Sequence, residues 1–490
     1  MNFPSDLCSK IVFGLFFSAM VSNHVLAQLT LNSTDDEIIS LTFNNKIDNA
    51  IELCKKQSEL NPNTLKYKFL CTNAKTLDIG NKIREQRGMN RDSLRNLYFG
   101  ELVEFCETSI DGVEEENLSL DERFFYAGIL GYKARAYGSQ GSWWSAFSTG
   151  LSARSRMEDI IEQNPNFYDA YLLLGMMDYY SDRLSGVMGF IAGMLGLSGD
   201  RDKGIEYMNL AFEKGTIVKS QALILMIELY GMLEGNEEES LKFVEIYTNK
   251  YPEHERYQNW KFQLYLRRFM MSKADEMKSL LKDDFFDEYA LANYYFHKGD
   301  LGKSREYFEL MIQNKEAYWS GAIENANYNL ALSYFLEGNL KRYKEYLPKL
   351  DENNRERIEI ETSTEASAKD LFETMVLIGK TDNFSDEVIR TINQKIEKAK
   401  GNEAVEKLLL YKASYLYKTA KYNEALVEFS RLRDSEIESI KSETYHYLID
   451  IYLKMEQKKQ QVEALVEEID DFDNDRLVFR SMDLEKKYGI

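Results

Sequence analysis

The 490-residue sequence predicts an all-α protein in which helix–turn–helix repeats stack into an α-solenoid. Apolar residues recur at helical spacing on both sides of short turns, as in 287–312, where Ala292 and Tyr295 precede Gly299 and Phe308 follows it. The same plan recurs along the chain, and the sequence contains only 5 prolines. Because one helix pair cannot bury its apolar face alone, such pairs are expected to stack on one another.

The clearest units are 287–312, 325–347 and 407–432. In 287–312 a small residue on each helix, Ala292 and Ser304, allows close approach, and aromatic residues fill the remaining space. A weaker first unit covers 35–63 and closes at Asn61-Pro62-Asn63. The closure recurs at 164–166 and, altered, at 251–253. A proline disfavours helical geometry in the residue before it, so these positions predict the ends of second helices.

Two segments depart from this plan. The uncharged segment 184–199 occupies a place where a repeat needs only a turn, within a predicted insertion at 183–199. Its glycines follow helical spacing, which predicts an inserted helix packed closely on a neighbour; alternatively, the segment covers a ligand or contacts a membrane surface. At 16 residues it is short for a membrane span. The polar segment 351–367 predicts a loop or a frayed helix.

The N-terminal sequence predicts an exported protein. Lys10 precedes an apolar run at 11–21, and Ala27 is a suitable last residue of a signal peptide cleaved before Gln28. An uncleaved anchor is the alternative. We expect a periplasmic or cell-envelope protein of a bacterium, with no transmembrane span in the mature chain. Behind the signal peptide (1–27), the predicted parts are 28–254, 255–350 and 351–490, the last ending in a polar cap.

Three cysteines lie behind the predicted signal peptide: Cys54, Cys71 and Cys106. An odd number leaves at least one thiol unpaired in an exported protein. Cys54 falls where a second helix carries an apolar residue, so packing explains it without a bond. We expect free core thiols, with a disulfide between Cys54 and Cys71 as the alternative.

The three clear units resemble the tetratricopeptide repeat, a helix–turn–helix of about 34 residues. The central block, 141–229, is also similar to a bacterial group of exported tetratricopeptide proteins, itself distantly similar to the tetratricopeptide-repeat-39 and inclusion-body-clearance family. The residues that carry this second resemblance are Gly150, Asn164-Pro165, Asp169-Ala170, Leu174-Gly175, Asp178-Tyr179-Tyr180, Leu195-Gly196, Gly199-Asp200-Arg201, Gly204, Ala211 and Gly215. Neither resemblance implies a reaction.

In the tetratricopeptide family the first helices line a concave groove, and the resemblance places ten side chains of this sequence there. Aromatic rings and asparagine amides would suit an extended peptide, although packing alone also explains them. The ten residues are Phe286, Tyr289, Asn293, Phe296, Asn325, Tyr328, Phe335, Leu410, Ser414 and Tyr417.

A second candidate site is a basic cluster in a chain of net charge −20. Residues 124–157 include no acidic residue, and arginine with tryptophan suits recognition of a carboxylate or an acidic peptide. Alternatively, the basic residues pair with neighbouring acidic ones and Trp143 packs beneath the insertion. The cluster consists of Lys133, Arg135, Trp143, Trp144, Arg154 and Arg156.

The sequence favours a non-catalytic scaffold that binds a protein or peptide on its concave face. Net negative charge disfavours nucleic acid, and His254, His297 and His446 are not at metal-ligand spacing. No phosphate-binding loop or nucleophile elbow is present, so we expect no enzyme activity, metal or cofactor. The alternative function is a periplasmic accessory protein that holds a small apolar or anionic ligand near the glycine-rich insertion, as in some transport systems.

Overall fold

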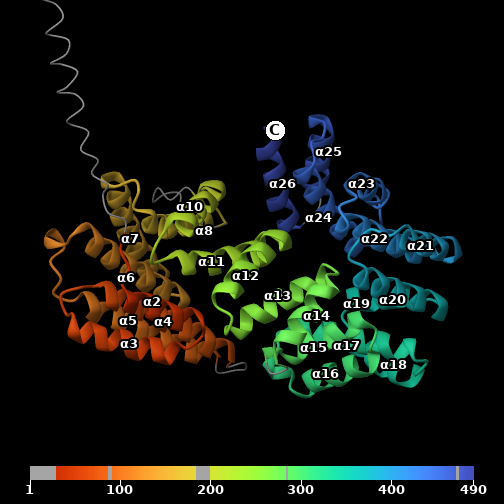
Figure 1. Ribbon diagram of the computed structural model, residues 1–490, viewed down its shortest axis with the longest axis horizontal. Helices are drawn as coiled ribbons and strands as arrows, with labels where there is room; N and C mark the ends of the chain where they lie inside the picture. The colour runs from red at the N-terminus through yellow and green to blue at the C-terminus, as the bar shows by residue number, and fades with distance from the viewer. Residues whose placement is uncertain (1–28, 86–90, 184–198, 283–284, 471–473) are drawn as a thin grey trace, which may run out of the picture. The chain divides into compact units, whose positions relative to one another are not determined.

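The computed structural model describes residues 29–85, 91–183, 199–282, 285–470 and 474–490, and these residues form helices and no β-strand (Figure 1). Successive helices pack against each other, as in the pairs α6–α7, α15–α16 and α22–α23. The predicted all-α, solenoid-like fold is therefore confirmed for the described residues. The predicted signal peptide and residues 184–198 of the predicted insertion lie outside them.

The described residues divide into two compact units, and parts of the first four described helices belong to each. Of the described residues, unit 1 takes those within 29–39, 54–72 and 103–219, and unit 2 those within 40–53, 73–102 and 220–490. The four divided helices are α2 (Ser33–Phe43), α3 (Ile47–Leu60), α4 (Lys66–Glu85) and α5 (Arg91–Ile110).

Unit 1 is built on antiparallel helices that approach closely. Its other long helices are α6 (Leu120–Ser139), α7 (Trp143–Gln163), α8 (Tyr171–Asp182) and α10 (Arg201–Lys214). A side chain at Gly175 would place its Cβ 2.7 Å from the Gly204 carbonyl oxygen, and one at Gly204 would lie 2.6 Å from the Tyr179 nitrogen. The contact between α8 and α10 thus requires glycine on both helices.

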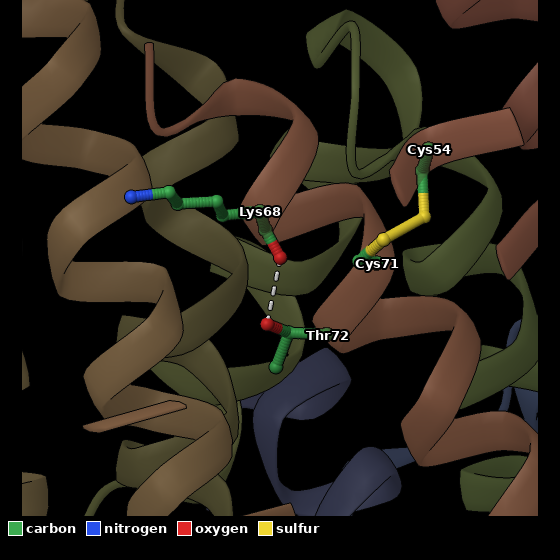
Figure 2. Close-up of a disulfide and its surroundings, with 4 residues drawn as sticks. All are labelled: Cys54, Lys68, Cys71 and Thr72. Atoms are coloured by element: carbon green, nitrogen blue, oxygen red, sulfur yellow. Dashed lines mark hydrogen bonds between the residues drawn. A yellow bond between two sulfur atoms is a disulfide. The ribbon is translucent and has the colours of Figure 1, made fainter. Parts of the chain in front are cut away.

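Cys54 and Cys71 form a disulfide that joins α3 to α4 within unit 1 (Figure 2). The expectation of free thiols was wrong for this pair, because adjacent helices bring the two Cα atoms to 5.6 Å. Cys106 is buried and takes no part in this disulfide. With a sequence separation of 17, the crosslink removes roughly 3 kcal/mol of unfolded-chain entropy.

Unit 2 continues the helical order to the C-terminus. Its helices are α11 (Lys219–Glu228), α12 (Glu237–Lys250), α13 (Glu255–Arg267), α14 (Met271–Leu280), α15 (Glu288–Lys298), α16 (Leu301–Gln313), α17 (Ser320–Leu336), α18 (Leu340–Tyr346), α19 (Glu352–Glu361), α20 (Glu365–Lys380), α21 (Asp386–Lys398), α22 (Asn402–Lys418), α23 (Tyr422–Ser430), α24 (Glu438–Lys454), α25 (Lys459–Asp470) and α26 (Asp475–Tyr488). Figure 1 shows α21 and α22 side by side, with α23 beside α22. One apolar core lies among α15 to α21, and a second lies among α22 to α26.

The helix ends predicted from the prolines and from the turn at Gly299 are confirmed. α3, α7 and α12 each end two residues before a proline, at Pro62, Pro165 and Pro252 respectively. Gly299 caps α15 with φ 84°, a left-handed conformation that glycine adopts without steric cost. Proline and glycine therefore fix where the helices of these units stop.

The polar segment 351–367 is largely helical, contrary to the prediction of a loop or frayed helix. Asp351 accepts a hydrogen bond from the Asn354 backbone N–H at 2.7 Å and so caps α19. Ile358 of α19 is completely buried, and the helix packs on α17, α20 and α22. The buried face of α19 is a single isoleucine among charged residues. The apolar periodicity of the segment is therefore too weak to predict this helix from the sequence.

Among the described residues, no helix has both the length and the apolar composition needed to cross a membrane.

Candidate binding site

The two arginines of the predicted basic cluster in α7 are held by carboxylates of unit 1. Arg156 donates to both carboxylate oxygens of Glu115, at 2.6 and 2.7 Å. Arg154 forms an ion pair with Asp178 at 2.8 Å, and Asp178 is buried. These pairs compensate the charges of the arginines and hold α7 against its neighbours.

The remaining members of the cluster differ in exposure. Lys133 pairs with Glu107 at 2.9 Å. Arg135 is exposed and has no ion pair among the described residues. Trp143 and Trp144, at the start of α7, are 60% and 74% exposed. Arg135 and the two tryptophans thus form the accessible part of the cluster, and partner binding there stays a prediction.

The predicted groove residues near α15 are mostly packed. Phe286, Asn293 and Phe296 are buried. The Asn293 side-chain amide donates to the Tyr289 carbonyl oxygen at 2.7 Å, within one turn of its own helix. The Tyr289 ring meets the Trp319 ring edge to face, with centroids 5.1 Å apart. These contacts are typical of packing between helices and do not indicate an open groove.

The groove residues of α17 are likewise engaged by neighbours. Tyr328 is buried, and the Arg357 guanidinium of α19 lies 4.5 Å from its ring centroid. The Phe335 ring packs against Tyr343, at 5.1 Å between centroids. Asn325 accepts a hydrogen bond from the side chain of Asn329 at 3.0 Å.

The α22 residues are placed differently, because two of the three reach a cavity. Leu410 is buried in the core, and its carbonyl oxygen accepts from the Ser414 hydroxyl at 2.8 Å. Ser414 and Tyr417 line an open cavity of about 310 Å³ in unit 2, whose other lining residues come from α12, α22, α23, α24 and the turn between α13 and α14. This volume suits a small group or one or two side chains.

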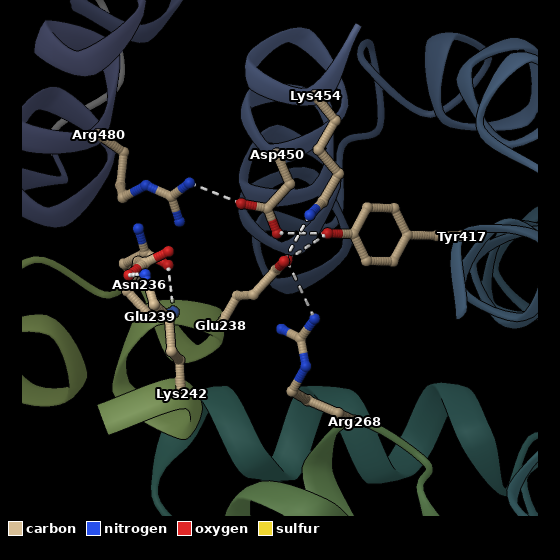
Figure 3. Close-up of polar contacts among 9 residues, drawn as sticks. All are labelled: Asn236, Glu238, Glu239, Lys242, Arg268, Tyr417, Asp450, Lys454 and Arg480. Carbon is tan, nitrogen blue, oxygen red and sulfur yellow. Dashed lines mark hydrogen bonds and ion pairs between the residues drawn. The ribbon is translucent and has the colours of Figure 1, made fainter. Parts of the chain in front are cut away.

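Glu238 is the carboxylate on which the polar contacts of this cavity converge (Figure 3). Its Oε2 atom accepts from the Tyr417 hydroxyl at 2.9 Å and pairs with Nη2 of Arg268 at 3.4 Å. Its Oε1 atom pairs with the Lys454 ammonium. The cavity is therefore built on residues from α12, α22, α24 and the end of α13.

Local sequence explains where Glu238 lies. Residues Leu229–Leu233 continue α11 as a π-helical turn, and Gly235, with φ 64°, leads out of it. The Asn236 side chain then caps α12 by accepting from the Glu239 N–H at 3.1 Å. Three glutamates follow in the first turn, where negative charge complements the helix dipole. Glu238 is the one directed into the cavity (Figure 3).

A second, deeper carboxylate shares the Tyr417 hydroxyl. Asp450 Oδ2 lies 3.2 Å from that hydroxyl, and Asp450 Oδ1 accepts from Arg480 at 2.6 Å. Burial alone would raise the pKa of Asp450, but the adjacent Arg480 guanidinium holds it below its usual range. Burial and the two carboxylates raise the pKa of Tyr417, so its hydroxyl remains a hydrogen-bond donor.

Lys418, at one wall of the cavity, fastens three segments together. Its ammonium donates to the carbonyl oxygens of Phe269, Ile378 and Thr381 at 2.5, 3.0 and 3.1 Å. It also pairs with Asp382 at 3.1 Å. Burial lowers the pKa of Lys418. These contacts occupy the Lys418 ammonium, so it is not available to a ligand.

Sequence reasoning identified Ser414 and Tyr417 but missed Glu238, Arg268 and Lys454. One signal was present: Lys418 and Lys454 are each the last residue of a 17-residue first helix, α22 and α24. Equivalent basic residues at two helix ends mark a shared position in the repeat. Glu238 had no such signal, because its partners lie as far as 216 residues away in the sequence.

Two histidines of unit 2 make its stability depend on pH. Burial lowers the pKa of both His297 and His446 to about 4, and Arg480 adds to the effect at His446. A folded-state pKa below the unfolded value gives stability that is complete above pH 6.5 and is lost as the pH falls toward 4. We expect a loss on the order of 3 kcal/mol from each histidine. Urea midpoints at pH 7 and pH 4.5 should differ less in the His297→Gln/His446→Gln variant; an equal difference would contradict this.

No family model matches the chain, and no curated protein matches it. Among the described residues, no three His, Cys, Asp or Glu side chains are arranged to hold a metal ion.

Proposed function

We propose that this chain is an exported, non-catalytic scaffold of tetratricopeptide-like repeats that binds a segment of another protein at the cavity of unit 2. The observation that carries the proposal is the cavity lining. Tyr417 and Tyr447 offer aromatic walls, Ser414 a hydroxyl, and Arg268 and Lys454 positive charge. These groups recognise polar and acidic segments without performing a reaction.

The repeat geometry supports the tetratricopeptide part of the proposal. α15 and α16 have 11 and 13 residues and are joined at Gly299, and α17, α22 and α24 have 17 residues each. Ser304 of α16 is completely buried and donates to the Ala292 carbonyl oxygen of α15 at 3.0 Å. Small residues at the crossing of paired helices are what the resemblance implies.

The disulfide supports export. Structural disulfides persist in oxidising compartments and are rare where thiols are kept reduced. Cys54 and Cys71 are both buried, and together with the signal peptide predicted at 1–27 they favour a periplasmic or cell-envelope location.

The proposal predicts that partner capture depends on the cavity cations. The tagged mature chain would be incubated with cell-envelope extract, and bound proteins quantified by mass spectrometry. We expect a stoichiometric partner that the Arg268→Gln/Lys454→Met variant loses at least tenfold. The matched control, Arg267→Gln/Lys298→Met, removes equal charge from pairs with Glu237 and Asp275, neither of which lines the cavity, and it should retain the partner.

Two results would contradict the proposal. Equal capture by both double variants would place the partner elsewhere, such as at Trp143 and Trp144. A co-purified small molecule in native mass spectra, without a protein partner, would instead favour the accessory-protein function.

A further inference from the structure

Glu238 enters the cavity from a part of the chain far from the groups that hold it. It lies in the first turn of α12, 179 residues before Tyr417 and 216 before Lys454. Its side chain is 38% exposed, whereas that of Asp450, the other carboxylate at the Tyr417 hydroxyl, is 12% exposed. Asp450 is a fixed part of the core, while Glu238 can leave the cavity without unpacking a helix.

More cations than carboxylates line the cavity: Lys242, Arg268, Lys418 and Lys454 against Glu238 and Glu245. Both Arg268 and Lys454 pair with Glu238, and no other ion-pair partner is found for either among the described residues. Among the neighbouring cations, Lys242 pairs with Glu239, Lys418 with Asp382 and Lys273 with Glu245, and the deeper Arg480 pairs with both Asp450 and Asp483. Two cations therefore share one anion, in a chain of net charge −20.

Arg268 is the less satisfied of the two cations. Its closest approach to Glu238 is 3.4 Å through one nitrogen, whereas a fully formed arginine–carboxylate pair has two contacts of about 2.8 Å. Its side chain is 19% exposed. A second carboxylate with access to the cavity could form the bidentate pair that Glu238 does not.

We propose that the cavity binds a carboxylate of an acidic peptide segment, and that Glu238 occupies this position until the segment displaces it. The inference rests on the function proposed above and adds the chemistry of the bound segment and an internal competitor. Tyr417 would donate to the incoming carboxylate as it now does to Glu238. The rings of Tyr422 and Tyr447, which also line the cavity, would contact the adjoining peptide.

An internal competitor lowers the apparent affinity for the peptide, because only the molecules in which Glu238 has left the site can bind it. Glu238→Gln keeps a hydrogen-bond acceptor for Tyr417 but removes the charge that holds Arg268 and Lys454. Acidic peptides should then bind about tenfold more tightly, a gain of about 1.4 kcal/mol. Added salt should reduce this binding, since it rests on charge.

The test uses the mature chain and a fluorescein-labelled hexaglutamate peptide, with hexaglutamine as the uncharged control. Fluorescence anisotropy would give the dissociation constants. Glu239→Gln is the matched variant, because Glu239 is adjacent, carries the same charge and pairs with Lys242. We expect tight binding of hexaglutamate by E238Q, weaker and similar binding by wild type and E239Q, and none by the Arg268→Gln/Lys454→Met variant. Urea midpoints would verify that each variant is folded.

Equal affinities of E238Q and wild type would overturn the inference, as would an equal gain in E239Q, which would indicate general electrostatics. The two proposals fail separately. If wild type and E238Q capture the same protein partner equally and peptide affinity is unchanged, the competitor is excluded and the scaffold function stands. If E238Q binds hexaglutamate more tightly but envelope extracts yield no partner, the carboxylate site stands and the scaffold function is wrong.

Discussion

Replacing Asp169 with alanine should destabilise unit 1 by about 4 kcal/mol, one of the two largest effects we expect of any single substitution. Asp169 is buried, and its Oδ1 atom accepts from the backbone N–H groups of Thr216, Ile217 and Val218, at 3.0, 2.7 and 2.9 Å. These three donors lie in the turn after α10. Alanine would leave them without an acceptor, and each unsatisfied buried donor costs about 1–3 kcal/mol.

The matched variant Asp169→Asn separates the loss of the hydrogen bonds from the general effect of substituting a buried residue. Its amide oxygen can still accept all three bonds at the Oδ1 position, so we expect a loss of only about 1 kcal/mol. Hydrogen–deuterium exchange of peptides covering 216–218 should accelerate strongly in D169A and slightly in D169N. Similar exchange in the two variants would show that the three hydrogen bonds do not hold this turn.

The sequence predicts the fold correctly where the prolines that end helices agree with the helical spacing of the apolar residues. Pro62, Pro165 and Pro252 fixed three helix ends because proline acts locally. α19 was missed because its buried face is narrow, and its cap at Asp351 lies in a run of polar residues. The Cys54–Cys71 bond could not be chosen over free thiols, since pairing depends on how two helices face each other.

The candidate site was predictable only where it follows the repeat. Tyr417 and Ser414 occupy first-helix positions, so the family resemblance placed them on an inner face. Glu238 and Arg268 come from the start of α12 and the end of α13, and their approach to α22 and α24 is set by tertiary packing. No local pattern encodes a contact across some 200 residues.

The other largest effect is expected at Arg480, because it compensates a buried carboxylate. The side chains of Arg480 and Asp450 are 3% and 12% exposed, and their atoms lie 2.6 Å apart. Arg480→Met would leave Asp450 charged and unpaired beneath Tyr417, which costs about 3–5 kcal/mol for a broken buried ion pair. Urea denaturation at pH 7 would measure this loss for unit 2.

The pH dependence of that loss identifies its cause. In the wild type, Arg480 holds the pKa of Asp450 below its usual range, so the pair stabilises above that range and weakens as the pH falls through it. In R480M the strongest charge opposing burial is lost and only weaker ones such as Arg268 remain, so the pKa of Asp450 rises and acid neutralises the carboxylate and relieves the penalty. The difference between wild type and R480M should therefore shrink from pH 7 to pH 4, and Asp450→Asn/Arg480→Met should recover about half of it at pH 7. A difference that stays constant with pH, or a double variant as unstable as R480M, would show that lost packing and not charge explains the effect.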